Sequence, residues 1–326
     1  MPLVDMPLED LTKYRGTNPK PEDFDEYWDS SVREMRSINP KPELVLSDFK
    51  TPFAECYDLY YTGIGGARIH AKLVKPRNVF EPCPAELVFH GYSGRSPEWG
   101  GLLAMAASGF VSVAMDCRGQ AGESEDVGHH KGNTLNGHII RGLEDNNPKR
   151  LLFRDIFLDT AELAGIVMKL DFVDEKRVVA RGGSQGGALT LACASLEPKI
   201  KLAFATYPFL CDYKRVWEMD MAERAYAELK RYFRNFDPKH EREDLIFTKL
   251  GYIDVQFLVP RIKAKVKMVT GLMDDVCPPS TQFAAFNKML CEKESIIYPD
   301  FGHEDLPGEW ENDYYMWVLN EFNIEL

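Results

Sequence analysis

Short, almost continuous runs of apolar residues recur along the chain from residue 85 onward. Such runs are typical of strands buried on both faces, as in a parallel sheet. Six are found, at 85–91, 109–116, 177–183, 201–208, 266–272 and 295–300. Helical patterns separate them, at 98–107, 155–170, 186–196, 280–291 and 309–323. This alternation predicts an α/β fold with a mostly parallel central sheet flanked by helices, whose ligands gather where the strands end.

The first part of the chain follows other patterns. Residues 1–50 are expected to form a helical extension, because four apolar residues between 24 and 35 recur at near-helical spacing behind an acidic start. From 54 to 76, alternating polar and apolar residues flank a Gly-Gly pair. This pattern predicts an antiparallel hairpin.

Two segments interrupt the alternation of strands and helices. Residues 122–153 are polar and too long for an ordinary loop, so we expect them to be functional or to pack at an interface. Residues 212–255 are helical, charged and aromatic, and we expect them to form a cap over the site. No linker divides the chain, so residues 1–326 are expected to form one domain.

Composition and charge narrow the function. The 326 residues carry a formal net charge of −12, which argues against binding to a nucleic-acid backbone. No apolar run approaches the roughly 18 residues of a membrane helix, so no membrane partner is expected. The acidic, proline-broken N-terminus does not resemble a signal peptide, and a cytoplasmic location is the expectation.

Cysteine and histidine spacing gives no sign of a metal site. The seven cysteines are scattered and odd in number, which favours free, buried thiols. The only close histidine pair, in the sequence GHH at 128–130, is adjacent, and adjacent side chains rarely point at one ion. We therefore expect neither a metal nor an organic cofactor.

The stretch RVVARGGSQGGALTLACA places Ser184 between an apolar strand and an apolar helix. This is the context of a nucleophile elbow, a sharp strand-to-helix turn that presents a serine hydroxyl above the sheet. Gly182 and Gly186 would leave room where a Cβ would collide with a neighbouring strand or helix. An incidental serine in a flexible turn is the alternative.

A serine hydroxyl needs a base, and the order of this fold is serine, acid, histidine. Only His240 and His303 follow Ser184. His240 lies in a charged segment and is expected to be exposed, whereas His303 follows a predicted strand on a glycine-containing loop. Asp274 and Asp275 both follow the preceding strand, and the residues alone do not decide which one orients the imidazole.

A tetrahedral oxyanion requires two N–H donors. One is expected from Gln185, the residue after the nucleophile, at a positively polarised helix N-terminus. The second is expected from the backbone of Tyr92, in HGYSG after the strand at 85–91. A mere tight turn is the alternative for that sequence.

Together these residues resemble the acetyl xylan esterase and cephalosporin-C deacetylase family, carbohydrate esterase family 7 of the α/β-hydrolases. Three sequence blocks carry the resemblance, which spans nearly the whole chain: Arg118-Gly119-Gln120, Gly182-Gly183-Ser184-Gln185-Gly186 and His303-Glu304. Ala121 stands where the family pattern leads us to expect glycine or a similar small residue.

The resemblance implies Ser184 as nucleophile, Asp274 as acid and His303 as base, with Tyr92 and Gln185 as oxyanion donors. It thereby favours Asp274 over Asp275. It also implies a homo-hexamer built as a dimer of trimers, with small acetylated sugars or cephalosporin C as substrates. A short-chain carboxylesterase or peptidase on the same fold remains the alternative, and a non-catalytic binding protein is a more distant one.

Overall fold

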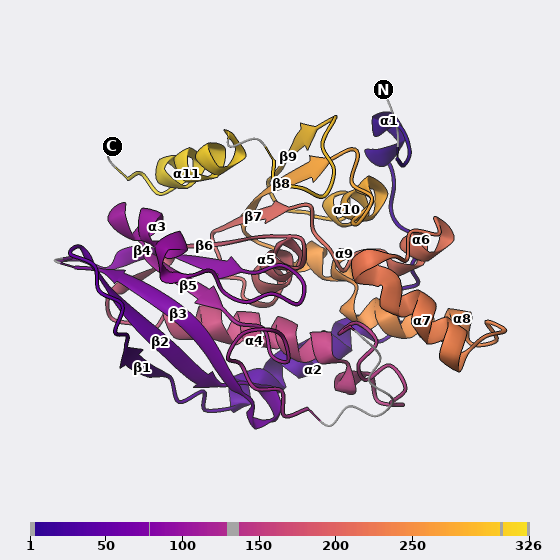
Figure 1. Cartoon of the computed structure of the whole chain (residues 1–326), viewed down its shortest axis with the longest axis horizontal. Helices are drawn as coiled ribbons and strands as arrows, with labels where there is room; N and C mark the ends of the chain where they lie inside the picture. The colour runs from indigo at the N-terminus through magenta and orange to yellow at the C-terminus, as the bar shows by residue number, and fades with distance from the viewer. Residues whose placement is uncertain (1–3, 78, 129–136, 307–308, 325–326) are drawn as a thin grey trace.

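The computed structural model describes residues 4–77, 79–128, 137–306 and 309–324. Within them, one nine-stranded sheet runs through the molecule (Figure 1). Its strands are β1 (Glu43–Leu46), β2 (Ala54–Thr62), β3 (Arg68–Pro76), β4 (Cys83–Phe89), β5 (Val111–Met115), β6 (Val173–Gly183), β7 (Leu202–Thr206), β8 (Lys265–Gly271) and β9 (Lys293–Tyr298).

The sheet has an antiparallel part and a parallel part. Its spatial order is β1-β2-β3-β5-β4-β6-β7-β8-β9. The pairs from β1 to β5 are antiparallel, and every pair from β5 onward to β9 is parallel. The predicted mostly parallel α/β sheet is confirmed, and the predicted hairpin is β2 with β3. Strand order reverses around β4, so the loops after β4 and β6 leave the sheet side by side.

Helices cover both faces of the sheet (Figure 1). One face packs against α3 and α11, and the other against α4, α5 and α10, with α2 behind α4. The bounds of these helices are α2 (Phe24–Ser37), α3 (Leu103–Ala107), α4 (Leu152–Val167), α5 (Gln185–Leu196), α10 (Pro279–Phe286) and α11 (Glu309–Glu321). Helix α5 is buried at every position, which explains its mostly apolar sequence.

The N-terminal fifty residues are less helical than expected. The structure has a short helix α1 (Leu8–Leu11) and α2, but 43–46 form the edge strand β1. Strand β1 pairs with β2, and its four residues are exposed or half-buried because it lies at the edge of the sheet. In α2 the helical spacing was informative, since Trp28 is fully buried and stacks on Phe157 of α4.

Residues 212–255 contain three helices, α6 (Tyr213–Glu218), α7 (Ala227–Phe236) and α8 (Glu243–Leu250), and lead into α9 (Val255–Leu258). They lie together beyond the carboxyl end of β7, on the right of Figure 1. Of 122–153, residues 129–136, including the two histidines of GHH, lie outside the described part of the chain. The helices in the described ranges include none that is long and apolar enough to cross a membrane.

Candidate active site

Ser184 stands at a sharp turn between β6 and α5. Its backbone has φ +56° and ψ −119°, a conformation that non-glycine residues rarely adopt. The Ser184 N–H donates to Thr206 O at 3.0 Å, and Ser184 O accepts from Phe209 N at 3.0 Å, so the neighbouring strand β7 and its loop hold the turn. Such strain, on the order of 1–3 kcal/mol, persists where the surrounding structure enforces it, often at functional sites.

The glycines around Ser184 are required by close backbone packing. A Cβ on Gly186 would lie 2.0 Å from Phe89 O, and one on Gly182 would lie 2.6 Å from Gly186 itself. Neither glycine has a positive φ, so steric room and not backbone freedom explains them. The expected reason for these two glycines is therefore observed: β4, β6 and α5 approach too closely for any side chain.

His303 joins the serine to a buried carboxylate. Its Nε2 lies 3.0 Å from Ser184 Oγ, and its Nδ1 lies 2.9 Å from Asp274 Oδ2. Asp274 is fully buried, and its Oδ1 accepts the N–H groups of Val276 and Cys277 at 2.9 and 2.7 Å. A carboxylate held this way keeps one orientation and leaves the other oxygen for the imidazole.

The competing acid and histidine lie elsewhere. Asp275 is half exposed and pairs with Arg224 at 3.0 Å. His240 is exposed and lies 3.3 Å from Glu243, three residues further along the same surface segment. The structure thus brings Asp274 and His303 to Ser184 and leaves Asp275 and His240 out of this contact.

The two expected oxyanion donors follow adjacent parallel strands. Phe89 of β4 pairs with Gly182 of β6. Just beyond this pair, Tyr92 lies in the loop after β4 and Gln185 begins α5. Gln185 is the first residue of α5, and the first N–H groups of a helix have no intrahelical acceptor. Among the described residues, no acceptor contacts the Tyr92 N–H either. Both donors are therefore available to a ligand.

Two of the sequence blocks that carry the family resemblance contact each other through their glutamines. The side-chain amides of Gln120 and Gln185 exchange two hydrogen bonds, at 2.8 and 3.1 Å. Gln185 Nε2 also lies 3.4 Å from the carbonyls of His90 and Gly91. The turn after β5 is thereby fixed to the start of α5 and to the loop that carries Tyr92.

Arg118, Gly119 and Glu304 lie outside the reacting atoms. Arg118 is buried and makes a bidentate pair with Asp159 of α4, at 2.6 and 2.7 Å. Gly119 has φ +68°, which a turn at this point requires. Exposed Glu304 accepts the Gly302 N–H at 3.1 Å and so shapes the loop that presents His303.

The acetyl xylan esterase (AXE1) family model matches residues 1–321. The chain belongs to the acetyl xylan esterase family. This is a family of carboxylic ester hydrolases, and the membership confirms the resemblance inferred from the three sequence blocks.

Solved members of the family superpose closely. Acetyl xylan esterase 1 from Thermoanaerobacterium sp. JW/SL YS485 is 57% identical, with a TM-score of 0.94 over 97% of this chain and 99% of that one. The acetyl xylan esterase from Paenibacillus sp. R4 is 34% identical, with a TM-score of 0.91 over 96% and 99%.

A curated relative is more distant. The acetyl esterase Axe7A of Xylanibacter ruminicola is 27% identical over 285 residues, which make up 86% of this chain. The chain spans 62% of the length of that relative.

Two neighbours of the contact between Asp274, His303 and Ser184 were missed in the sequence. Tyr207, which follows β7, places its ring 4.6 Å from the His303 ring, and Gln282 of α10 lies 3.3 Å from Asp274 Oδ2. Tyr207 lies in the sequence TYP at the end of the predicted strand at 201–208, and this position beside the strand that leads to Ser184 was the available signal. No signal in the sequence predicted the contact of Gln282 with Asp274, because this contact depends on how α10 packs.

One group of potential metal ligands occurs in the described residues, and it overlaps the triad. Ligand atoms of Asp274, Cys277 and His303 lie within 4.8 Å of one another. Burial raises the pKa of the Cys277 thiol well above its usual value. A metal here would take the lone pair that His303 needs as a base, so the set fits a triad better than a metal cofactor site. All seven cysteines are free and six are buried, as expected.

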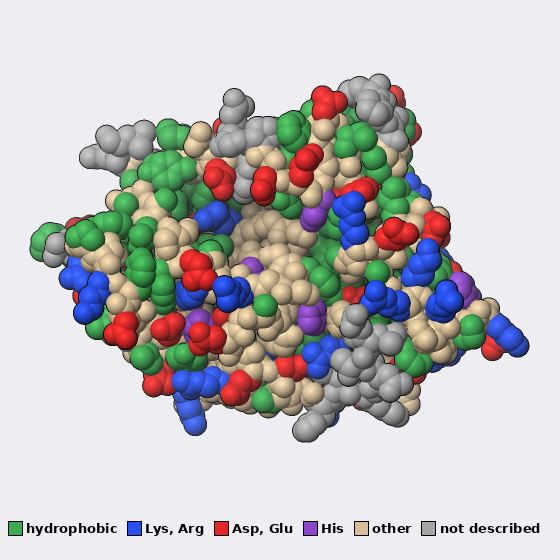
Figure 2. All heavy atoms as spheres, viewed as in Figure 1, with side chains coloured by type: hydrophobic (Ala, Val, Ile, Leu, Met, Phe, Trp, Pro, Cys, Tyr) green, Lys and Arg blue, Asp and Glu red, His purple; other side chains and the backbone are tan. Residues whose placement is uncertain are grey.

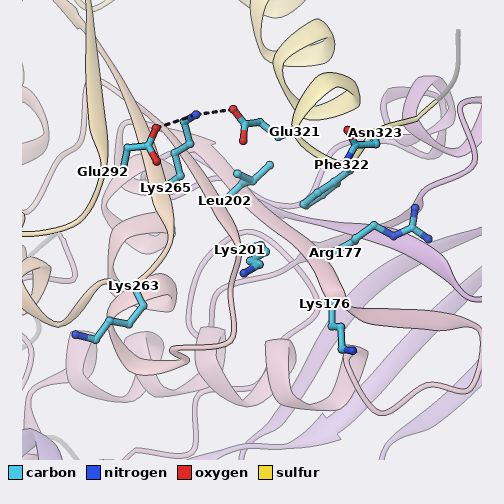
Figure 3. A pocket seen from close by; sticks show the side chains of 10 residues that line it. All are labelled: Lys176, Arg177, Lys201, Leu202, Lys263, Lys265, Glu292, Glu321, Phe322 and Asn323. Carbon is cyan, nitrogen blue, oxygen red and sulfur yellow. Dashed lines mark hydrogen bonds and ion pairs between the residues drawn. The ribbon is translucent and has the colours of Figure 1, made fainter.

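The basic cavity in Figure 3 is separate from the contact between Asp274, His303 and Ser184, none of which lines it. It has a volume of about 360 Å³ and is lined by Lys201, Lys263 and Lys265, among others. Lys265 begins β8, so the cavity lies at the amino ends of the strands, opposite Ser184. Helix carboxyl ends also point there and favour cations. By contrast, Figure 2 shows a hollow near the middle of the molecule, where Figure 1 draws β7 and α5. Histidine side chains lie at the edge of this hollow.

Proposed function

We propose that this protein is a serine esterase that removes acetyl groups from small acetylated substrates through an acyl-enzyme on Ser184. The observation that carries the proposal is the linear contact from Asp274 through His303 to Ser184, at 2.9 and 3.0 Å, at a strained strand-to-helix turn. Family membership supports the acetyl ester as the substrate class.

The reaction has two acyl-transfer steps. His303 Nε2 takes the proton of Ser184 as its oxygen attacks the acetyl carbonyl. The resulting oxyanion accepts the N–H groups of Tyr92 and Gln185, and the alcohol leaves with the proton from His303. Water then repeats the sequence on the acyl-enzyme, releasing acetate. Buried Asp274 keeps Nδ1 protonated and stabilises the imidazolium that forms in each step.

Acetylated xylo-oligosaccharides and cephalosporin C are the substrates we propose. The relatives named acetyl xylan esterase support the first, and the family resemblance supports the second. Kinetics on a panel of acetylated xylo-oligosaccharides, other acetylated sugars and cephalosporin C test this choice. A preference for long acyl esters or for peptides would favour the carboxylesterase or peptidase alternative.

The experiment for the mechanism is Ser184→Ala with p-nitrophenyl acetate. We expect a loss of roughly a millionfold in kcat, because the triad acts as a unit. Mass spectrometry of the protein quenched during turnover should show a 42 Da acetyl adduct, about the mass of one acetyl group replacing hydrogen. Retention of most activity by the variant would show that Ser184 is not the nucleophile.

We also propose a homo-hexamer and a cytoplasmic location. The hexamer follows from the family resemblance, and seven free cysteines are compatible with a reducing compartment. Light scattering of the purified protein tests the hexamer, and a monomer or dimer would contradict it.

A further inference from the structure

The side chain of Tyr92 is fixed on all sides although only its backbone is expected to contact substrate. Its ring stacks on Phe153 of α4 and meets the rings of Phe209 and His138 edge-on, at 5.2 Å each. Its hydroxyl donates a short hydrogen bond to Glu228 of α7 and accepts the His138 N–H at 2.6 Å. The oxyanion-hole residue is thus tied to two segments remote in sequence.

Glu228 is a buried carboxylate enclosed by backbone. It is 3% exposed, and it accepts the N–H groups of His138 and Ile140 at 3.2 and 3.0 Å besides the Tyr92 hydroxyl. A Cβ on Gly137 would lie 2.2 Å from Glu228 Oε1, so the chain there must be glycine to wrap the carboxylate. Among the described residues, no Lys or Arg pairs with it. A buried charge held by donors alone indicates a specific positioning role.

The backbone on the other side of Tyr92 has its own anchor. His90 Nδ1 donates to Gly91 O at 2.8 Å, while its Nε2 accepts the Cys117 N–H at 3.0 Å. The Tyr92 N–H therefore lies between a fixed peptide on one side and a clamped side chain on the other. Loss of the hydrogen bond to Glu228 would therefore free the Tyr92 side chain while the peptide at His90 and Gly91 stays fixed.

We propose that Glu228 is a positioning residue that holds Tyr92 so that its backbone N–H faces the developing oxyanion. The inference rests on the proposed serine esterase function. It links α7, within 212–255, to the catalytic centre through one carboxylate.

The ionisation of Glu228 gives the proposal a distinctive pH signature. Burial raises the pKa of Glu228 to about 7, although hydrogen bonds from Tyr92 and backbone N–H groups oppose the shift. The titratable groups that face it are Tyr92, His138 and Tyr213; burial lowers the pKa of His138 to about 4 and raises those of both tyrosines. Glu228 alone among them changes charge near neutral pH.

The same helix offers a matched control. Tyr232 of α7 donates a short hydrogen bond to Glu144, which also lies 3.5 Å from Arg242. This is a second phenol–carboxylate contact between α7 and the chain before α4, but it does not touch Tyr92. Glu144→Gln therefore removes the same kind of charged acceptor without reaching the oxyanion hole.

The experiment compares E228Q, Y92F, the double variant and E144Q with the unaltered protein. For E228Q and Y92F we expect kcat on p-nitrophenyl acetate to fall about tenfold with KM nearly unchanged, because a displaced donor costs less than the hundredfold or more of a deleted one. The double variant should lose no more than either single one, since both break one contact. E144Q should keep kcat within about twofold.

The pH dependence separates positioning from a general structural effect. The ratio of kcat between the unaltered protein and E228Q should be greatest above pH 7 and approach one well below it, because protonation of Glu228 removes the charged acceptor. Taking this ratio cancels any pH dependence that both proteins share. Melting temperatures measured alongside report the fold.

Three outcomes would overturn the positioning role of Glu228, and a fourth would overturn the esterase mechanism. Unchanged kcat in Y92F, which keeps the backbone donor and removes only the hydroxyl, would overturn the proposal even if E228Q did not fold. An equal loss in E144Q, or a ratio independent of pH, would also overturn it and indicate a structural contact. If S184A retains activity, the esterase mechanism itself fails, and this outcome is independent of the Glu228 variants.

Discussion

Among the described residues, His303 and His70 are both paired with buried aspartates, yet only His303 also contacts a serine hydroxyl. His303 places Nδ1 2.9 Å from Asp274 and Nε2 3.0 Å from Ser184. His70 of β3 places Nδ1 2.7 Å from Asp116 and Nε2 3.0 Å from Asp58. The second nitrogen therefore faces a hydroxyl in one pair and a carboxylate in the other.

That difference decides what each ring can do. Burial alone would lower the pKa of His70, but hydrogen bonds to Asp116 and Asp58 outweigh it and raise the pKa. The pKa of Asp116 is correspondingly held well below its usual value: burial would raise it, but hydrogen bonds from His70 and from the N–H groups of Glu123 and Ser96 outweigh that effect. Both ring nitrogens of His70 thus face carboxylates, and neither is left to contact a hydroxyl. His303 keeps a lone pair directed at the serine.

The largest expected effect comes from removing the His303 ring. His303→Ala should lower kcat by roughly a millionfold, as loss of a triad base does, while leaving the melting temperature within a few degrees. Steady-state assays with p-nitrophenyl acetate and a thermal melt measure both quantities. Substantial remaining activity would remove His303 from its role.

The role of Asp274 is tested by comparison with Asp275, its neighbour in the sequence. Asp274→Asn should cost about 10⁴-fold in kcat, because an amide no longer holds the imidazole in the correct tautomer. Asp275→Asn removes only a half-exposed pair with Arg224 and should change kcat by less than about twofold. A greater loss at 275 than at 274 would reverse the assignment of the acid.

For the structural pair, stability and not chemistry should change. His70→Gln leaves Asp116, only 2% exposed, without its cationic partner and should lower the free energy of unfolding by about 3 kcal/mol. Denaturant unfolding measures this loss. The kcat of the folded fraction should stay within a few-fold, and a collapse of kcat would mean that His70 also serves the site.

The smallest effect is a pH dependence of that stability. Because the pKa of His70 is raised on folding, its contribution is complete below its unfolded pKa and is lost as pH rises through the folded one. The difference in unfolding free energy between the unaltered protein and His70→Gln should therefore shrink as pH rises above the ordinary histidine pKa of about 6.5. A constant difference would show that His70 stabilises the fold while neutral.

Much of the fold followed from local patterns. The six apolar runs became β4 to β9, and α5 lies where an apolar helix was predicted after GGSQGG. The exception, β1, is a four-residue edge strand whose half-exposed residues carry too little pattern to distinguish it from a helix. Short edge strands are defined by their partner, and here the partner is β2.

The sequence by itself determined the chemical groups of the site, because a nucleophile elbow needs glycines and a serine that are adjacent in the chain. Their order also restricted the base to His240 or His303. Only the tertiary structure shows that Asp274 is buried and bonded whereas Asp275 is not. The same holds for the contacts of Tyr92 with Glu228, 136 residues apart, and of His70 with Asp116, 46 apart. Burial and partners at such separations depend on how strands and helices pack, and no local pattern records them.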